Sequence, residues 1–167
     1  MLILYKQIEQ LFNNKGYEFI KINGIEYREL FNCNYNIKVK NSFLKKNIRE
    51  ATAADDNERK TLLRETIQGI DYFINDLNSR QFVIQMKYND RKDLAGCLSL
   101  FQFIIRDNIL HLFVFVRSQH FENNFLYDNQ TYMLITNALS DELKKRGIKI
   151  KTEKINVHIT SLHTERN

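Results

Sequence analysis

The chain has 167 residues, the size of one ordinary domain, and 43% of them are hydrophobic, which is enough for a single packed core. Its formal net charge of +5 suits an anionic ligand such as a nucleotide phosphate, but no run of Lys and Arg is dense enough to indicate specific nucleic-acid binding. No apolar run approaches the length of a membrane span, and the opening MLILY is too short for a signal peptide. We therefore expect one domain over residues 1–167 and no membrane association.

The two cysteines, Cys33 and Cys97, form no CxxC pair and no zinc-binding pattern with histidine. Because a disulfide framework is not expected, the default compartment is a reducing cytoplasm. The composition is rich in Asn, Lys, Ile and Phe and lacks Pro and Trp. That bias is typical of an AT-rich genome, such as that of a Gram-positive bacterium or its phage.

The N-terminal half alternates helical and extended patterns. The hydrophobic stripe of 58–77 predicts a helix, and the polar segment 41–56 predicts irregular structure. The other expected elements are a helix over 1–14, a strand over 17–22 before the Asn23-Gly24 turn, a short strand over 35–39, a strand over 81–87 and a charged loop over 89–93.

In the C-terminal half, two apolar runs over 97–105 and 109–116 predict a hairpin closed by Asp107-Asn108. Residues 127–146 predict a long helix that ends at Gly147, and 148–159 alternate as a strand with one solvated face. This order of elements predicts an α+β domain: a mostly antiparallel or mixed sheet with helices packed on one face.

Residues 94–103, LAGCLSLFQF, contain a cysteine followed five residues later by Gln102-Phe103. This pattern resembles the active-site hairpin of thymidylate synthases and pyrimidine-nucleotide hydroxymethylases, although Gly96 stands where proline is usual and Leu98 where histidine is usual. The resemblance implies a thymidylate-synthase-like fold with a twisted sheet. It also implies that Cys97 is the nucleophile that attacks carbon 6 of the base. The alternative is a buried core cysteine, which is common for this residue type.

Arg117-Ser118 follows Gln102 by fifteen residues, the spacing of the family's phosphate-binding pair. An arginine at the end of a buried strand is costly unless it meets an anion, and the guanidinium fork fits phosphate oxygens. The alternative is a strand-end arginine paired with a carboxylate.

The segment NSRQFV, with Arg80 at its centre, resembles the family segment whose arginine reaches across a dimer interface to the partner's phosphate site. The resemblance therefore implies a homodimer with shared sites. An exposed arginine in a loop between a helix and a strand is the simpler alternative.

Two further positions concern the base and the sugar. Asp128 stands where uracil-specific enzymes of the family carry asparagine and cytidylate hydroxymethylases carry aspartate, so the resemblance implies that it reads the base edge together with Gln102 and Cys97. Alternatively, Asp128 caps the helix that follows. His163 resembles the family histidine that touches the ribose, but Glu165 stands where the family has tyrosine; the alternative is a frayed tail.

The family's catalytic glutamate and most of its folate pocket have no match in this sequence. We therefore expect a shortened homodimer that binds a pyrimidine nucleotide without full synthase activity and that sequesters, senses or regulates nucleotides, for instance in a phage. Two alternatives remain. One is an active methylase or hydroxymethylase acting on dUMP or dCMP, which would use 5,10-methylenetetrahydrofolate and the Cys97 nucleophile. The other is a structural or interaction protein with a degenerate pocket.

Overall fold

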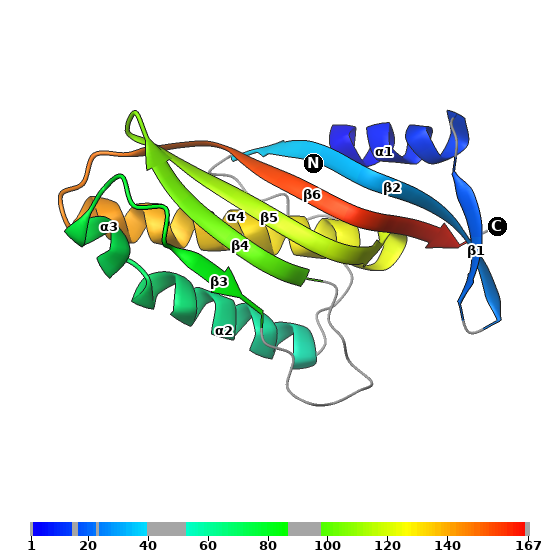
Figure 1. Ribbon diagram of the computed structural model, residues 1–167, viewed down its shortest axis with the longest axis horizontal. Coiled ribbons are helices and arrows are strands. Elements are labelled where there is room, and N and C mark those ends of the chain that lie inside the picture. The colour runs from blue at the N-terminus through cyan, green and yellow to red at the C-terminus, as the bar shows by residue number, and fades with distance from the viewer. Residues whose placement is uncertain (1, 15–16, 23, 40–52, 87–97, 166–167) are drawn as a thin grey trace.

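The computed structural model describes residues 2–14, 17–22, 24–39, 53–86 and 98–165. It is an α+β fold built on one six-stranded mixed sheet in the order β1-β2-β6-β5-β4-β3 (Figure 1). Every adjacent pair is antiparallel except β5 and β6, which are parallel. The strands are β1 (Glu18–Ile22), β2 (Ile25–Lys38), β3 (Val83–Gln85), β4 (Leu98–Arg106), β5 (Ile109–His120) and β6 (Lys151–Glu165).

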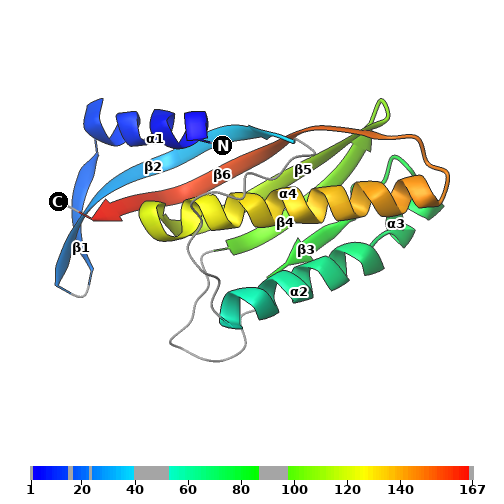
Figure 2. The same ribbon diagram turned by 180° about the vertical axis from the view of Figure 1, so that it is seen from behind.

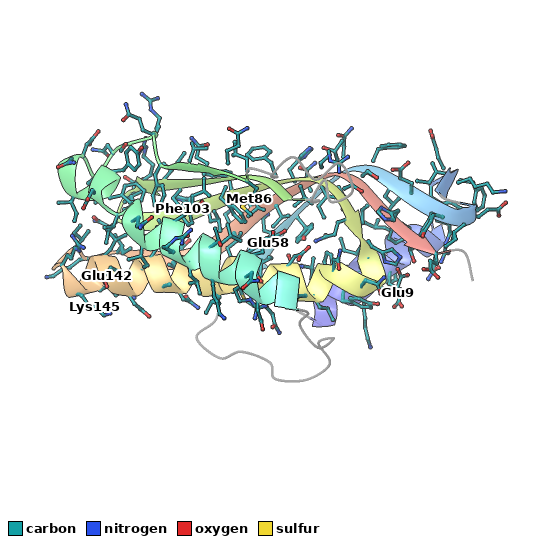
Figure 3. The ribbon with its side chains drawn as sticks, turned by 90° about the horizontal axis from the view of Figure 1, so that it is seen from below. Glu9, Glu58, Met86, Phe103, Glu142 and Lys145 are labelled. Carbon is teal, nitrogen blue, oxygen red and sulfur yellow. The ribbon has the colours of Figure 1, made fainter. Side chains whose placement is uncertain are left out.

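Three helices pack against one face of this sheet: α1 (Leu2–Asn14), α2 (Ala53–Gln68) and α4 (Phe121–Lys145). The short helix α3 (Asp71–Asn75) follows α2. Figure 2 shows α2 and α4 crossing the sheet, and Figure 3 shows the helices on one side and the strands on the other. Helix α4 is also the crossover that the parallel pair β5–β6 requires. The predicted fold class, an α+β domain with helices on one face of a mostly antiparallel or mixed sheet, is confirmed.

The two faces of the sheet differ completely in burial. One row of paired residues faces the helices and is buried in every strand that it crosses. This row consists of Tyr35, Val157, Val114, Phe101 and Ile84. The other face carries no helix among the described residues, and we call it the open face (Figure 1).

The two central rows of the open face contain no charged residue, although 27% of the chain is charged. The first row is Asn36, Asn156, Phe113, Gln102 and Val83, and the second is Asn34, His158, Phe115, Leu100 and Gln85. None of these side chains is buried. The centre of the open face is therefore neutral, accessible and partly aromatic.

Helix α4 begins six residues earlier than the predicted 127, at Phe121. Its first turn is held by aromatic packing, since Phe121 stacks on Tyr5 of α1 with ring centroids 4.4 Å apart. The predicted stop is confirmed: Gly147 has φ +82°, and the N–H groups of Gly147 and Ile148 donate to the last carbonyls of the helix.

The single helix predicted over 58–77 is instead two helices, because the chain turns at Gly69. A Cβ at Gly69 would lie 2.1 Å from Cε2 of Phe82, so only glycine fits there. The helix α2 also begins at Ala53, inside the segment 41–56 that was predicted to be irregular. Residues 40–52, and with them most of that prediction, lie outside the described residues, as does the predicted loop 89–93.

The strand β2 is much longer than the predicted 35–39, and β6 begins three residues later and ends six residues later than the predicted 148–159. The pattern hid these lengths because the in–out alternation breaks within both strands, as described below. The predicted 107–108 turn is confirmed, since Asp107 and Asn108 both have positive φ, 51° and 60°, as two-residue hairpin turns require.

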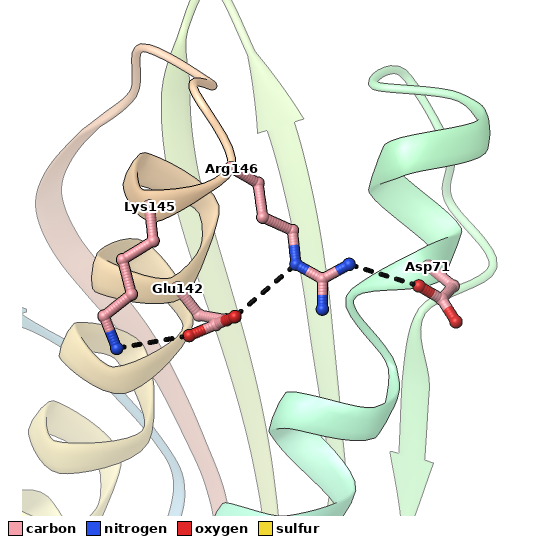
Figure 4. Close-up of polar contacts among 4 residues, drawn as sticks. All are labelled: Asp71, Glu142, Lys145 and Arg146. Atoms are coloured by element: carbon pink, nitrogen blue, oxygen red, sulfur yellow. Dashed lines mark hydrogen bonds and ion pairs between the residues drawn. The ribbon is translucent and has the colours of Figure 1, made fainter.

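At the far end of α4, a small ion-pair network joins this helix to α3 (Figure 4). Arg146 lies 3.4 Å from Glu142 of its own helix and 3.8 Å from Asp71 of α3, and Lys145 lies 3.3 Å from Glu142. These side chains are largely solvated, so the network adds little to stability.

Candidate functional site

The in–out alternation of β2, β5 and β6 breaks at the same level of the sheet. Each strand has two consecutive residues there that are not buried: 31–32 in β2, 117–118 in β5 and 160–161 in β6. Phe31, Ser161 and Ser118 are cross-strand neighbours, so the three breaks lie side by side. Asn32 has φ 52°, a left-handed conformation that asparagine tolerates better than most residues. We call this line across the three strands the crease.

The predicted phosphate pair Arg117-Ser118 forms the β5 part of the crease. Arg117 is exposed, whereas Ser118 is half-buried and pairs with Ser161 of β6. The pairing of β4 with β5 ends at Leu98–Val116, and β5 continues to His120. Among the described residues, the last four positions of β5 therefore have a neighbouring strand on one side only. Cys97 itself lies outside the described residues, directly before Leu98.

His163 lies one step beyond the crease, on the same face as Ser118. It pairs with His120 of β5 and with Glu29 of β2, and its ring meets the ring of His120 edge-on at 5.3 Å between centroids. The ring of Tyr27 meets His163 edge-on, also at 5.3 Å. His163 is therefore an ordered member of a polar cluster, and the frayed-tail alternative is wrong.

Carboxylates surround this histidine pair. His120 Nδ1 lies 3.2 Å from Glu122 Oε2, and His120 Nε2 lies 3.6 Å from Glu165 Oε1. Glu29 accepts a hydrogen bond from Ser161, and Glu122 accepts one from Thr164. Burial raises the pKa of Glu122, while burial and the adjacent His120 lower the pKa of His163.

Asp128 lies on the helix side of the sheet, behind the crease. It is well inside α4, which begins at Phe121, so the alternative that it caps this helix is wrong. Its Oδ2 accepts a hydrogen bond of 2.6 Å from Nε2 of Gln119, a fully buried residue between Ser118 and His120. Asp128 is thus tied to the strand that carries the predicted phosphate pair.

Beside Asp128, Arg59 of α2 covers the face of Tyr127, with its guanidinium carbon 4.2 Å from the ring centroid. Both Nε and Nη2 of Arg59 donate to Thr131 Oγ1 at 3.2 Å. The cavity that remains between α2 and α4 has a volume of about 30 Å³, which suffices for a water molecule but not for a nucleobase. In this conformation the helix side of the sheet is closed at Asp128.

The two remaining predicted residues lie away from the crease. Gln102 is in the open face, and its Nε2 donates to the backbone carbonyl of Arg80 at 3.1 Å. Gln102 pairs with Val83 of β3, and Arg80 comes three residues before Val83. Leu98 pairs with Val116 of β5, and Arg117 comes directly after Val116. Because Gln102 and Leu98 are four residues apart on β4, Arg80 and Arg117 of one chain are separated by at least about 14 Å along the strands.

The structure therefore brings Arg117, Ser118 and His163 together, holds Asp128 behind them, and separates Arg80 and Gln102 from them. The other members of the cluster were not predicted from the sequence: Tyr27, Glu29, His120 and Glu122. His120 and Glu122 follow Ser118 closely, which was a usable signal. Tyr27 and Glu29 come from a distant part of the chain, and only the β2–β6 pairing brings them in.

No group of three or more His, Cys, Asp or Glu side chains within the described ranges is arranged to hold a metal ion. The helices described here are also all too short or too polar to span a membrane. No family model matches the sequence, and no curated protein is significantly similar to it.

Proposed function

We propose that this protein is a shortened thymidylate-synthase-like homodimer that binds a nucleotide, by expectation a pyrimidine nucleotide, and that it sequesters, senses or regulates nucleotides without full synthase activity. The observation that carries the proposal is the meeting of Arg117, Ser118 and His163 at the crease. These residues were selected from the sequence for one ligand, and they come from two different strands.

The chemistry of the crease suits the two ends of a nucleotide. The exposed guanidinium of Arg117 and the hydroxyl of Ser118 are donors for a phosphate. On the other side, Glu29 and Glu165 are acceptors that suit ribose hydroxyl groups, which carboxylates bind in other nucleotide sites. The cation thus lies in the crease, and the carboxylates lie beyond it along β2 and β6.

The second copy in this proposal docks on the open face. Charged residues are depleted and aromatic residues enriched at the centre of protein–protein interfaces, and the two central rows match both features. Their amide side chains, Asn34, Asn36, Asn156, Gln85 and Gln102, each donate and accept. Such groups can pair with their own symmetry copies across a two-fold axis.

The binding test is a thermal-stability measurement with dUMP, dCMP, UMP, CMP and cyclic nucleotides, for the native protein and Arg117→Ala. A ligand at a hundred times its dissociation constant should stabilise the native protein by roughly 2.7 kcal/mol and leave Arg117→Ala unchanged. Arg64→Ala, which removes an exposed arginine of α2, is the matched control and should respond like the native protein. No stabilisation by any nucleotide would overturn the binding proposal.

The donation of Arg80 across the interface has its own test, because Arg80 and Arg117 of one chain lie well apart along the strands. Arg80→Ala and Arg117→Ala should each lose binding. When the two variants are mixed and allowed to exchange subunits, each mixed dimer should regain one intact site. If mixing restores nothing while mixed dimers form, Arg80 does not act across the interface.

A further inference from the structure

All four histidines of the chain lie in β5 and β6, and one of them, His158, is at the centre of the open face. Its cross-strand neighbours are Asn34 of β2 and Phe115 of β5. The rings of His158 and Phe115 are 6.0 Å apart between centroids. His158 is therefore the titratable group closest to the middle of the surface on which the proposed second copy docks.

The hydrogen bonds around His158 fix its tautomer. Nδ2 of Asn34 donates to the backbone carbonyl of Asn32 at 3.0 Å, so Oδ1 of Asn34 points toward His158. This oxygen lies 2.7 Å from Nδ1 of His158 and can only accept. Nδ1 therefore carries the proton in the neutral ring, and Nε2 is left as an acceptor that can gain a proton and a charge.

Among the described residues of β2 and β5 that face His158, none would compensate such a charge. The β2 residues that face it are Asn32, Asn34 and Asn36, and the β5 residues are Phe113 and Phe115. The nearest charged residue on these strands is Arg117, two positions beyond Phe115 on β5, and it has the same sign as an imidazolium. Burying an uncompensated charge in an interface is strongly unfavourable.

We propose that His158 is a proton switch of the homodimer: the dimer forms while His158 is neutral and dissociates when it is protonated. This inference rests on the proposed function, because it takes the open face as the dimer interface. A two-fold dimer buries two copies of His158, so two protons must be released on association. By linkage, the dissociation constant should rise by up to roughly a hundredfold for each unit by which the pH falls while both rings are protonated in the free subunits.

The test is the molar mass of the full chain in solution at fixed micromolar concentration, at about pH 7.5 and about pH 5.5, on either side of the usual imidazole range. We expect a dimer at the higher pH and a monomer at the lower, with circular dichroism showing that the chain stays folded at both. His158→Gln, whose amide can still donate to Asn34, should remain dimeric at both. His111→Gln removes a histidine of β5 instead and should keep the full pH response.

The possible failures are distinguishable. A monomer at about pH 7.5 would refute the dimer itself, and with it the proposed function in its present form. A native dimer that persists at the lower pH would overturn the switch and leave the dimer standing. A pH response that survives in His158→Gln would also overturn the His158 switch. It would assign the response to the His120–His163 pair beside the crease.

Discussion

The two faces of the sheet are built from the same strands but differ in burial. The row that contains Phe101 and Val114 is buried from edge to edge beneath α2 and α4, whereas the next row, which contains Phe115 and His158, has no cover among the described residues. Both rows are free of charge. On the packed face this is the ordinary result of burial, but on an accessible face it has to be explained by something outside the chain.

The difference between the two faces indicates which residues are available for function. The residue types of the packed face are determined by the helices that cover them. They therefore give information about the fold but little about function. Residues of the open face are not buried by the folded chain, and an uncharged surface with exposed phenylalanines is a liability unless it is covered. The crease lies at the edge of this second region.

The largest expected effect compares one phenylalanine from each face. Phe103 is completely buried and packs 4.8 Å from the ring of Phe82, whereas Phe115 is 41% exposed. Phe103→Ala should lower the free energy of unfolding by about 3–5 kcal/mol. Phe115→Ala should cost less than about 1 kcal/mol in the separated subunit, because a half-exposed ring loses little on truncation. Urea denaturation at a concentration that keeps the chain monomeric measures both, and equal losses would contradict the contrast between the faces.

A smaller effect is expected where the packed face meets the α2–α3 turn. Gly69→Ala would push a methyl group into the ring of Phe82, which is 2% exposed and held on three sides by aromatic rings, Tyr72, Phe73 and Phe103. Overpacking of this kind costs about 1–3 kcal/mol. In Phe82→Leu, which makes room, the same glycine change should cost clearly less. Purely additive losses in the double variant would show that the clash is not the cause.

These two predictions also show what the sequence could determine. The packed face was predictable because hydrophobic periodicity records burial, and the 97–105 and 109–116 runs, the 107–108 turn and the Gly147 stop were found this way. Gly69 was missed because the stripe of apolar residues continues across it. At Gly69 the ring of Phe82 packs so close that no side chain fits, a contact that no local pattern records.

The crease was invisible for a related reason. The alternation of buried and exposed residues is followed along one strand at a time. A break at 31–32 or 160–161 therefore resembles the end of a strand, although the strand continues and only the positions of its buried side chains change. For this reason β2 was predicted much too short and β6 was predicted to end at 159 instead of Glu165. Arg117, Ser118 and His163 could still be selected by their spacing and resemblance, but their partners Tyr27 and Glu29 depend on a strand pairing that periodicity does not contain.

A modest effect of pH should come from the crease itself. Because burial and His120 lower the pKa of His163 from its ordinary 6.5, the unfolded chain binds more protons than the folded chain just below that pH. Stability should therefore fall as the pH decreases from about 7 to about 5.5, and His163→Gln should flatten this fall. Glu122, whose pKa is raised, acts with the opposite sign, but it is present in both proteins and cancels in the difference. An unchanged pH profile in His163→Gln, measured by urea denaturation, would contradict this account.

The smallest effect is expected at the ion pairs between α4 and α3, which make the most visible polar contacts of the molecule (Figure 4). Arg146→Ala removes contacts of 3.4 Å to Glu142 and 3.8 Å to Asp71, yet the arginine side chain is 44% exposed and that of Asp71 is 74% exposed. Exposed pairs contribute about 0.2–1 kcal/mol, and salt screens them further. We therefore expect a loss below about 1 kcal/mol that shrinks in about 1 M salt, as measured by thermal unfolding. A loss as large as that of Phe103→Ala would mean that charge at the rim, rather than burial on one face, holds the helices to the sheet.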